Sequence, residues 1–485
     1  MLFNSYEYIF FFLPITFIIY FFLLHKRLTV GAKGFLVFAS LFFYSWWNIA
    51  YLPIILSSML FNYVIGNSLN NHFAKAKMGH RAILTFGIVA NLSMLGYFKY
   101  ADFFLENLND FSGANIELLH LALPLAISFF TFQQIAYLID SYRGETSEYD
   151  FLNYSLFVTF FPQLIAGPIV HHKEMMPQFA SKYNLVKNYK NIATGMFIFS
   201  MGLFKKVVIA DAFSVWASAG FDKAEVLNLV EAWATSLSYT FQLYFDFSGY
   251  TDMAIGAALL FNIRLPQNFN SPYKAKDIQD FWRRWHITLS HFLRDYIYIP
   301  LGGSRVSEMR IYNNLMITFI LGGLWHGAGW TFIFWGLLHG GALVIHRVWN
   351  NLGFQFNSFI AWFITFNFIN ISWVFFRAKE WSDALKVLKG MFFGEFMLPD
   401  KYASQLHFLS DFGISFGKVF ENISGKDKTI YFLVGAFIVV LTFKNSSFYR
   451  DNFKATYWNM IILCIMFFMA TSLMSNVSEF LYFNF

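Results

Sequence analysis

The stretch LGGLWHGAGWTFIFWGLLH, from Leu321 to His339, places two histidines in an apolar setting rich in glycine and tryptophan. An imidazole surrounded by hydrocarbon is unfavourable unless it forms a hydrogen bond, binds a ligand or takes part in chemistry. His326 and His339 are therefore candidates for functional residues. The rest of the chain has the composition of a membrane-embedded scaffold that holds this stretch at depth.

Composition indicates the class of protein. The chain has 485 residues, of which 57% are hydrophobic and only 13% are charged, whereas soluble domains carry about 25% charged residues. We therefore expect an all-α polytopic membrane protein with one domain over residues 1–485. The net charge of +6 comes from basic loops and does not indicate nucleic-acid binding. The single cysteine, Cys464, lies in an apolar run, and no Cys/His spacing indicates a metal site.

Apolar segments long enough to cross a bilayer occur along the whole chain. A spanning helix needs about 20 mostly apolar residues. The sequence predicts spans at residues 8–24, 34–50, 51–66, 82–99, 119–139, 191–212, 231–260, 312–326, 330–346, 358–376, 430–443 and 456–475. Two further stretches, 153–170 and 281–300, are interrupted by proline, glycine or charge, which favours re-entrant or interfacial segments.

Basic residues predict the orientation in the membrane. Loops rich in lysine and arginine follow the spans at 8–24 and 51–66 and precede those at 191–212 and 312–326. Because such loops face the cytoplasm, both termini are expected outside, with the first span retained. Three lysines deviate from this rule: Lys379, Lys386 and Lys389.

Two aspartates lie in the otherwise apolar segment Gln242–Gly256. Asp246 and Tyr250 are four residues apart and share a face of an unbroken helix. One interpretation is structural, with the carboxylates bonding neighbouring helices or capping a break at Ser248 and Gly249. The other is that Asp246 and Tyr250 form the polar wall of a substrate cavity.

The segment from Pro266 to Arg305 is too charged to cross lipid. Asp277 or Asp280 is expected to cap a helix, and Trp282 and Trp285 suit the headgroup level of the membrane. His286, Ser290 and Arg294 follow one another at four-residue spacing and would share a helix face. The segment is either an amphipathic interfacial helix or a docking site for a phosphate-bearing thioester such as coenzyme A, since guanidinium groups bind phosphate bidentately. The candidate donor-binding residues are Arg283, Arg284, Trp285, Ser290 and Arg294.

The chemistry predicted for His326 is general-base catalysis. If the chain rises from the cytoplasmic side at residue 312, His326 lies about 20 Å into the membrane, where Gly327 and Gly329 allow the chain to bend. A neutral imidazole there can take a proton from a hydroxyl. A hydrogen bond between helices and a metal-ligand role are the alternatives, and a helix–helix bond explains His339 as well. Gln163, within FFPQLIAGPIV, is expected to line a cavity.

These segments together resemble the membrane-bound O-acyltransferase (MBOAT) superfamily, and in particular its bacterial branch for alginate O-acetylation, peptidoglycan O-acetylation and teichoic-acid D-alanylation. The resemblance covers roughly residues 1–390 and is carried by LGYFKYADFF, LPLAISFFTFQQIAYLID, FFPQLIAGPI, QLYFDFSGYTDMAIG, FWRRWHITLSHFLRDYIYIPLGGSR and GGLWHGAGWTFIFWGLLHG.

The resemblance implies a ring of tilted helices around a central funnel in the bacterial inner membrane. His326 would be the buried catalytic histidine and His286 a second active-site histidine, with Trp325 beside the substrate. Acetyl-CoA would be a cytoplasmic donor substrate and not a bound cofactor. An extracytoplasmic acetyltransferase of the SGNH type would be the partner.

The C-terminal sequence SEFLYFNF, from Ser478 to Phe485, resembles the aromatic end of the shuttle peptide of D-alanyl transferases. An aromatic interfacial anchor is the simpler interpretation. The alternative is that Tyr482 carries the acyl group as a phenol ester, which is reactive because phenolate is a good leaving group.

The leading hypothesis from the sequence is acetyl transfer across the membrane for O-acetylation of an envelope polysaccharide, with peptidoglycan placed before an alginate-like exopolysaccharide and D-alanylation third. Two hypotheses from other classes remain. A proton-coupled transporter would use buried histidines and aspartates as a relay, and a scaffold would only recruit a periplasmic transferase.

Overall fold

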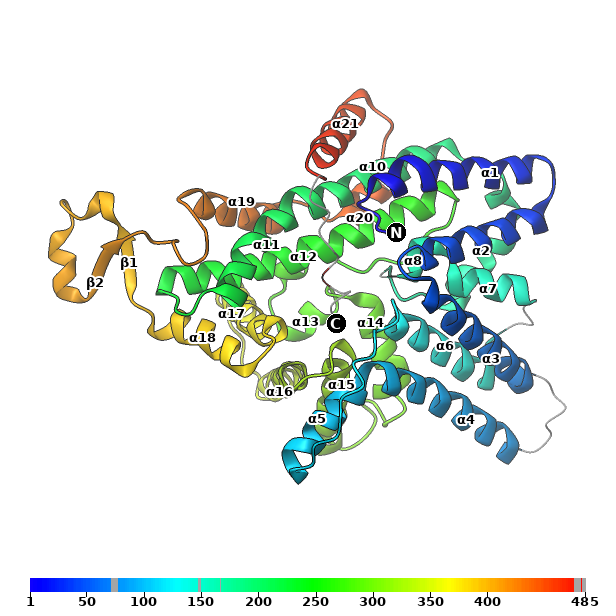
Figure 1. Ribbon diagram of the computed structural model, residues 1–485, viewed down its shortest axis with the longest axis horizontal. Helices are drawn as coiled ribbons and strands as arrows, with labels where there is room; N and C mark the ends of the chain where they lie inside the picture. The colour runs from blue at the N-terminus through cyan, green and yellow to red at the C-terminus, as the bar shows by residue number, and fades with distance from the viewer. Residues whose placement is uncertain (71–76, 147–149, 166, 475–480, 482–485) are drawn as a thin grey trace. The chain divides into compact units, whose positions relative to one another are not determined.

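The computed structural model describes residues 1–70, 77–146, 150–165, 167–474 and 481. Within these ranges nearly all regular structure is helical (Figure 1), which confirms the predicted all-α class. The described strands are β1 (Phe396–Pro399) and β2 (Ile414–Gly417), which pair in parallel with Phe396 opposite Ile414. This small sheet was not expected from the sequence, and each of its strands has only four residues.

The chain divides into two compact units. Unit 1 consists of Met1–Leu203, Tyr250–Gln267 and the described part of Asn452–Asn484. Unit 2 consists of Phe204–Gly249 and Asn268–Asp451. The 32-residue helix α12 (Leu229–Leu260) contributes its first part to unit 2 and its last part to unit 1.

The helices of unit 1 follow one another along the chain and are joined by loops and short turns. They are the π-helical turn η1 (Glu7–Phe12), α1 (Leu13–His25), α2 (Thr29–Ser45), α3 (Leu52–Asn70), α4 (Lys77–Leu95), α5 (Ala101–Ser112), α6 (Ile127–Tyr142), α7 (Phe151–Thr159), α8 (Phe161–Leu164), α9 (His172–Ala180), α10 (Tyr189–Phe204) and α21 (Tyr457–Ser472). Helix α6 begins later than the predicted span 119–139, because Pro124 precedes it and Ala126 has a positive φ of 59°.

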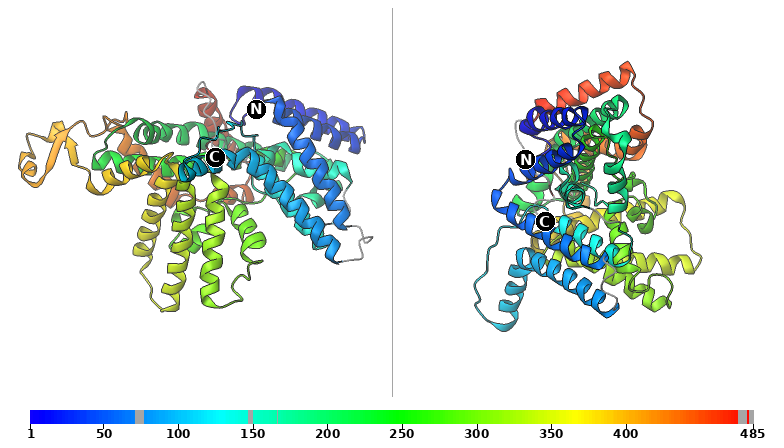
Figure 2. Two further views of the ribbon diagram at one scale, coloured as in Figure 1. Left: turned by 60° about the horizontal axis from the view of Figure 1, so that its bottom comes forward. Right: turned by 90° about the vertical axis from the view of Figure 1, so that its right-hand side faces the viewer.

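Unit 2 contains the stretch around His326. Its helices are α11 (Asp211–Ser218), α13 (Ile278–Trp282), α14 (Ile287–Leu293), α15 (Glu308–His326), α16 (Trp330–Asn351), α17 (Ser358–Arg377), α18 (Trp381–Phe393), α19 (Lys428–Thr442) and α20 (Ser446–Asp451), with π-helical turns at η5 (Lys205–Ala210), η6 (Ala219–Lys223) and η8 (Arg294–Tyr298). Helices α15, α16 and α17 lie alongside one another (Figure 2).

Six helical stretches of the described chain are long and apolar enough to cross a membrane. They are Glu7–His25, Ile49–Asn70, Gly79–Ser112, Tyr189–Lys223, Trp330–Asn351 and Ser358–Arg377. Each contains or overlaps a predicted span. Helices α2, α19 and α21 are apolar but shorter, and α12 and α15 carry more polar residues. A multi-pass membrane protein follows from these helices.

Glycines allow α15 and α16 to pack closely. A Cβ atom on Gly323 would lie 2.3 Å from the carbonyl oxygen of Phe332, and one on Gly336 would lie 2.3 Å from that of Phe319. Both distances are far below van der Waals contact. Small residues at a helix–helix interface are typical of membrane proteins, where close backbone approach replaces hydrophobic burial. This contact fixes the helix end that carries His326.

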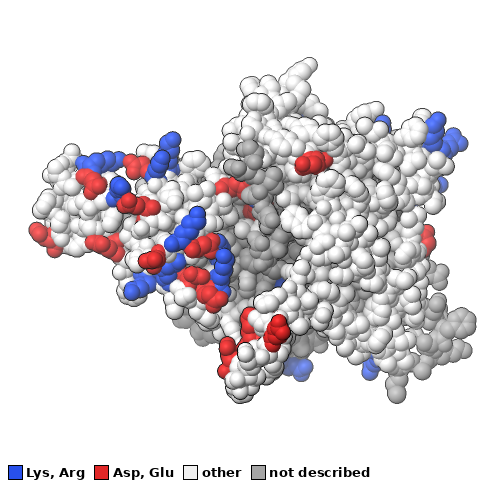
Figure 3. Space-filling view, viewed as in Figure 1, with Lys and Arg blue, Asp and Glu red and all other residues white. Residues whose placement is uncertain are grey.

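Charged side chains on the face in Figure 3 gather over the part of unit 2 that contains β1, β2 and α18, and most of the remaining face is uncharged. Two of the three lysines that deviate from the loop-charge rule lie near carboxylates. Lys379 lies 3.6 Å from Asp222, and Lys386 lies 3.7 Å from Asp383 and donates to a backbone carbonyl. The orientation in the membrane, from which these lysines deviate, stays a prediction.

Candidate active site

His326 is the last residue of α15, and the chain turns directly after it. Gly327 is extended, and α16 begins at Trp330. The predicted helix break at the glycines is confirmed. A Cβ atom on Gly327 would lie 2.2 Å from the ring of Phe332, so only glycine permits this turn without moving an aromatic side chain. The break presents the His326 imidazole at a helix end.

Aromatic rings surround His326, which is 4% exposed. The ring centroid of His326 lies 4.9 Å from that of Trp325, 5.2 Å from that of Trp335 and 5.1 Å from that of Phe376, all in steep edge-on arrangements. Such an environment favours the neutral imidazole, because a charged ring would lose its hydration. A neutral imidazole is the form that accepts a proton in general-base catalysis.

His286 lies between two short helices. The expected helix of this segment is interrupted, because α13 ends at Trp282 and His286 has a positive φ of 43° immediately before α14. A non-glycine residue in this conformation carries backbone strain, which is frequent at functional sites. Asp277 caps α13 by accepting from the backbone N–H of Asp280, as expected.

Asn268 holds the His286 ring. The Oδ1 atom of Asn268 accepts from both the backbone N–H and the hydroxyl of Thr288, and it lies 3.2 Å from Nδ1 of His286. An oxygen that accepts two other hydrogen bonds faces a donor at Nδ1, so in the neutral ring Nε2 is the basic nitrogen. Burial lowers the pKa of His286 to about 3. The ring is therefore neutral at physiological pH.

Trp325 lies between the two histidines. Its ring centroid is 6.2 Å from that of His286 and 4.9 Å from that of His326. All three residues belong to unit 2 and are buried. Residues separated by forty positions in the sequence thus form one cluster of two imidazoles and one indole. Before folding, only the family resemblance placed them in one site.

The tryptophans of the WRRWH segment are buried inside the protein, so the expectation that their side chains face lipid headgroups is wrong. Trp282 is 7% exposed and Trp285 is 1% exposed. The Trp285 ring packs 5.0 Å from that of Trp373 and stacks 5.7 Å from that of Phe281. The free energy of burying large rings inside the protein outweighs their preference for the interface. Trp285 thus anchors the backbone beside His286.

The arginines of the same segment point outward. Arg284 pairs with Asp280 at 2.7 Å, Arg294 pairs with Asp295 at 2.7 Å, and Arg283 is exposed. Ser290 is half-buried and donates to the Trp285 carbonyl. Donor binding by Arg283, Arg284, Trp285, Ser290 and Arg294 remains a prediction, with two of the guanidinium groups already paired to carboxylates.

Asp246 forms a buried ion pair with Lys206, at 2.7 Å between Nζ and Oδ1. Lys206 also pairs with Asp211 at 2.8 Å, and the side chains of Lys206 and Asp246 are 2% and 1% exposed. Helix α12 is unbroken at Ser248, so a capping role for the aspartate is excluded. The sequence reasoning missed Lys206, although a lysine inside the apolar run 191–212 is itself a signal for a buried partner.

Two predicted site residues belong to unit 1. Tyr250 is fully buried, and its ring stacks 4.7 Å from that of Phe3. Gln163 is buried and donates to the carbonyl of Phe157 at 2.6 Å. Their roles in substrate binding remain predictions. Tyr482 lies outside the described residues.

His339 bonds two helices, as its structural interpretation predicted. The indole N–H of Trp282 donates to Nδ1 at 3.2 Å, so Nε2 carries the proton and donates to the Ser372 hydroxyl at 3.0 Å. Both ring nitrogens are used, which leaves His339 with no proton to exchange with a substrate.

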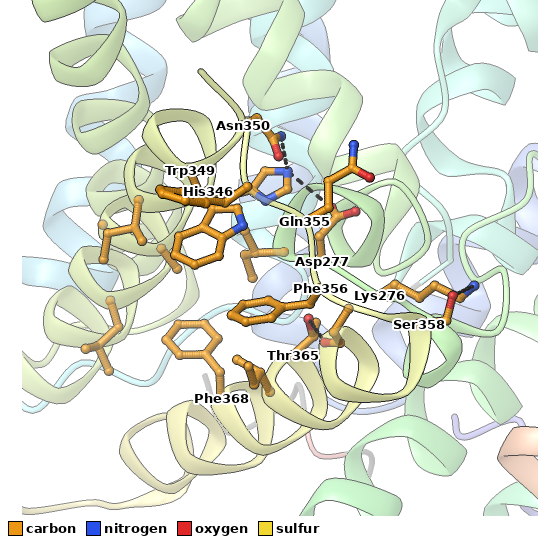
Figure 4. Close-up of a pocket in the computed structure, with 18 of the residues that line it drawn as sticks. Lys276, Asp277, His346, Trp349, Asn350, Gln355, Phe356, Ser358, Thr365 and Phe368 are labelled. Atoms are coloured by element: carbon orange, nitrogen blue, oxygen red, sulfur yellow. Dashed lines mark hydrogen bonds and ion pairs between the residues drawn. The ribbon is translucent and has the colours of Figure 1, made fainter. Parts of the chain in front are cut away.

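Two described cavities lie at the other end of α16 and are not lined by His286 or His326. The larger, of about 710 Å³, has a polar end with Asp277, His346 and Ser358 and an apolar end with Trp349 and Phe368 (Figure 4). His346 lies 3.6 Å from Asp277 and also lines the smaller cavity of about 290 Å³. The dimensions and mixed lining of the larger cavity suit an amphiphile.

The sequence profile of the membrane-bound O-acyltransferase family, MBOAT, matches residues 8–379. The chain belongs to this family. It is 56% identical to a protein named peptidoglycan O-acetyltransferase from Helicobacter pylori, over 81% of this chain and 80% of that protein. It is 40% identical to a probable alginate O-acetylase from Pseudomonas aeruginosa, over 82% of this chain and 76% of that protein. A teichoic acid D-alanyltransferase from Bacillus subtilis is 27% identical over 53% of this chain and 69% of its own length. Family membership establishes an O-acyltransferase and confirms the resemblance drawn from the motifs.

Proposed function

We propose that this O-acyltransferase transfers acetyl groups from a cytoplasmic thioester, acetyl-CoA, across the membrane for O-acetylation of peptidoglycan. The observation that carries the proposal is the buried cluster of His286, Trp325 and His326 in a chain that is 56% identical to a peptidoglycan O-acetyltransferase. Alginate-like exopolysaccharide is the second candidate polymer, supported by 40% identity to an alginate O-acetylase. D-alanyl transfer is third, supported by the weaker teichoic-acid relative.

In the proposed reaction, His326 removes the proton from an acceptor hydroxyl, and the resulting oxygen attacks the thioester carbonyl. The carbon–sulfur bond then breaks, and the thiolate leaves with the proton that the imidazole returns. His286 supports this step through its neutral ring, which can hydrogen-bond the reacting groups at Nε2. The rings around His326 exclude water, which would otherwise hydrolyse the thioester.

Localisation and partners complete the proposal. The protein would lie in the bacterial inner membrane with both termini outside, and an extracytoplasmic acetyltransferase of the SGNH type would accept the acetyl group. Tyr482 is the proposed carrier in that step. If Tyr482→Phe left acetylation of the polymer intact, the carrier role would be wrong.

The test uses a strain that lacks the gene and is complemented with wild type, His326→Ala or the control His407→Ala, whose histidine is exposed in unit 2. Acetate released by mild base from purified peptidoglycan should be restored by wild type and the control but not by His326→Ala. Restoration in the exopolysaccharide instead would favour the second polymer. Retained acetylation with His326→Ala at wild-type abundance would contradict an enzymatic role and favour a scaffold. A transporter would show no transfer from labelled acetyl-CoA to any acceptor.

A further inference from the structure

Unit 1 contains a cluster of one carboxylate and two imidazoles. Asp140 lies near the end of α6, and His171 and His172 lie at the start of α9. The Oδ2 atom of Asp140 lies 2.6 Å from Nε2 of His171 and 3.3 Å from Nδ1 of His172. The two imidazole rings lie 4.5 Å apart between centroids. One ligand atom from each residue therefore converges on a single point, within 4.8 Å of the others.

The cluster is buried on one side and open on the other. The side chains of Asp140 and His172 are 1% and 2% exposed, whereas that of His171 is 30% exposed. The guanidinium of Arg143 lies 3.8 Å from Oδ1 of Asp140, the oxygen that faces away from the imidazoles. His171 is therefore the ligand on the more exposed side of the cluster.

The hydrogen-bond pattern of His172 requires either a second proton or a metal ion at this point. Its Nε2 lies 3.3 Å from the carbonyl oxygen of Glu145. A carbonyl can only accept, so Nε2 carries the proton, and in the neutral ring Nδ1 then presents a lone pair to the Asp140 carboxylate. Two acceptors face each other at 3.3 Å unless a second proton or a metal ion lies between them.

We propose that Asp140, His171 and His172 form a binding site for a first-row divalent metal ion, with Zn²⁺ as the probe. Two imidazole nitrogens and one carboxylate oxygen are three of the four ligands that Zn²⁺ takes, and water would be the fourth on the open side. The Glu145 carbonyl supplies the outer hydrogen bond that orients a metal-bound histidine. Binding through Nε2 of His171 would replace its direct 2.6 Å contact with Oδ2 of Asp140 and the long 3.4 Å contact from the Lys173 N–H to its Nδ1.

The metal would join two parts of unit 1. His171 and His172 lie at the start of α9, and Asp140 lies near the end of α6. A metal bound to all three side chains would fix the start of α9 to the end of α6. Metal-dependent stability of unit 1 follows, because binding to the folded state alone stabilises it.

The first test measures Zn²⁺ binding by the full-length protein, purified in detergent and stripped with chelator. Titration calorimetry and metal analysis after dialysis should give one Zn²⁺ per chain and a higher thermal midpoint. Asp140→Asn and His172→Ala should lose at least tenfold in affinity, whereas His407→Ala, which removes an exposed histidine, should retain it. Equal binding by all four proteins would overturn the proposal, as would wild type that binds no Zn²⁺.

The second test does not depend on a loss of binding. In His171→Cys, a thiolate replaces the exposed ligand, and bound Co²⁺ should then show a sulfur-to-cobalt charge-transfer band that wild type lacks. A matched Lys173→Cys variant, whose side chain is exposed and pairs with Glu145, should show no such band. Absence of the band in His171→Cys would mean that the cluster is a carboxylate–imidazolium ion pair only and would overturn the proposal.

Discussion

The Oδ1 atom of Asn268 lies 3.2 Å from Nδ1 of His286, and this relationship sets which nitrogen of His286 is basic. Asn268→Ala removes the acceptor for three donors, all of them buried. We expect kcat to fall about 10- to 100-fold with a smaller change in KM, because the His286 ring loses the contact that orients it and sets its tautomer, and a small misplacement of a catalytic group can cost about a hundredfold in rate. Initial rates with labelled acetyl-CoA measure both constants.

Asn268→Asp distinguishes positioning from packing. The carboxylate keeps the size and the acceptor oxygen but favours a protonated His286. The acid side of the pH–rate profile should therefore move to higher pH than in wild type. An unchanged profile would mean that Asn268 only packs against the ring.

The burial of His286 also predicts that the stability of the folded protein depends on pH. Its pKa is lowered from 6.5 to about 3 by burial, so between these values the unfolded state binds more protons and acid destabilises the fold. The free energy of unfolding that depends on the neutral His286 is fully present above about pH 6.5. It falls by about 1.4 kcal/mol per pH unit as the pH falls toward 3. Thermal midpoints in detergent at several pH values should fall less steeply for His286→Gln than for wild type. Parallel curves would contradict burial of a neutral His286.

The Lys206–Asp246 pair predicts an asymmetry between two variants. Lys206→Met leaves the buried Asp246 carboxylate without its cation, which costs about 3–5 kcal/mol. Asp246→Asn costs less, because Lys206 keeps Asp211 at 2.8 Å and the amide can still accept. Thermal midpoints should therefore rank wild type above Asp246→Asn, and Asp246→Asn above Lys206→Met. The reverse order would show that Asp211 does not compensate.

His339 should matter for stability and not for the chemical step. His339→Leu leaves the buried Trp282 N–H without its acceptor, at a cost of about 1–3 kcal/mol, whereas the Ser372 hydroxyl keeps its bond to the Ile369 carbonyl. We expect a lower thermal midpoint and a kcat within about threefold of wild type at low temperature. A large loss of kcat with unchanged stability would place His339 in the catalytic machinery.

Local sequence signals predicted much of the fold. Apolar run length located the six long spans, and Gly327 and Gly329 located the break after His326, because both features act over a few neighbouring residues. The interruption at His286 was not predicted, since the contacts that Asn268 makes with His286 and Thr288 join residues about twenty positions apart. The late start of α6 and the pairing of β1 with β2 likewise depend on turns and contacts that the spacing of apolar residues does not show.

The site was predicted less completely than the fold. The sequence could propose His286 and His326 through the motifs that carry the family resemblance, but Asn268, Trp335 and Phe376 become neighbours only when the chain folds. Trp282 and Trp285 were assigned to the membrane surface because tryptophan favours it, yet their partners inside unit 2 are other aromatic residues far along the chain. Composition reports a preference for an environment, whereas packing decides which one a residue occupies.

The measurement that tests the account most directly is acetyl transfer from labelled acetyl-CoA by purified protein in liposomes, comparing His326→Ala with wild type and His407→Ala. His326→Ala should lose at least about a hundredfold in rate, as expected for removal of a general base, while its thermal midpoint and the activity of His407→Ala stay near wild type. Wild-type transfer by a folded His326→Ala protein would contradict the assignment of His326 as the catalytic base.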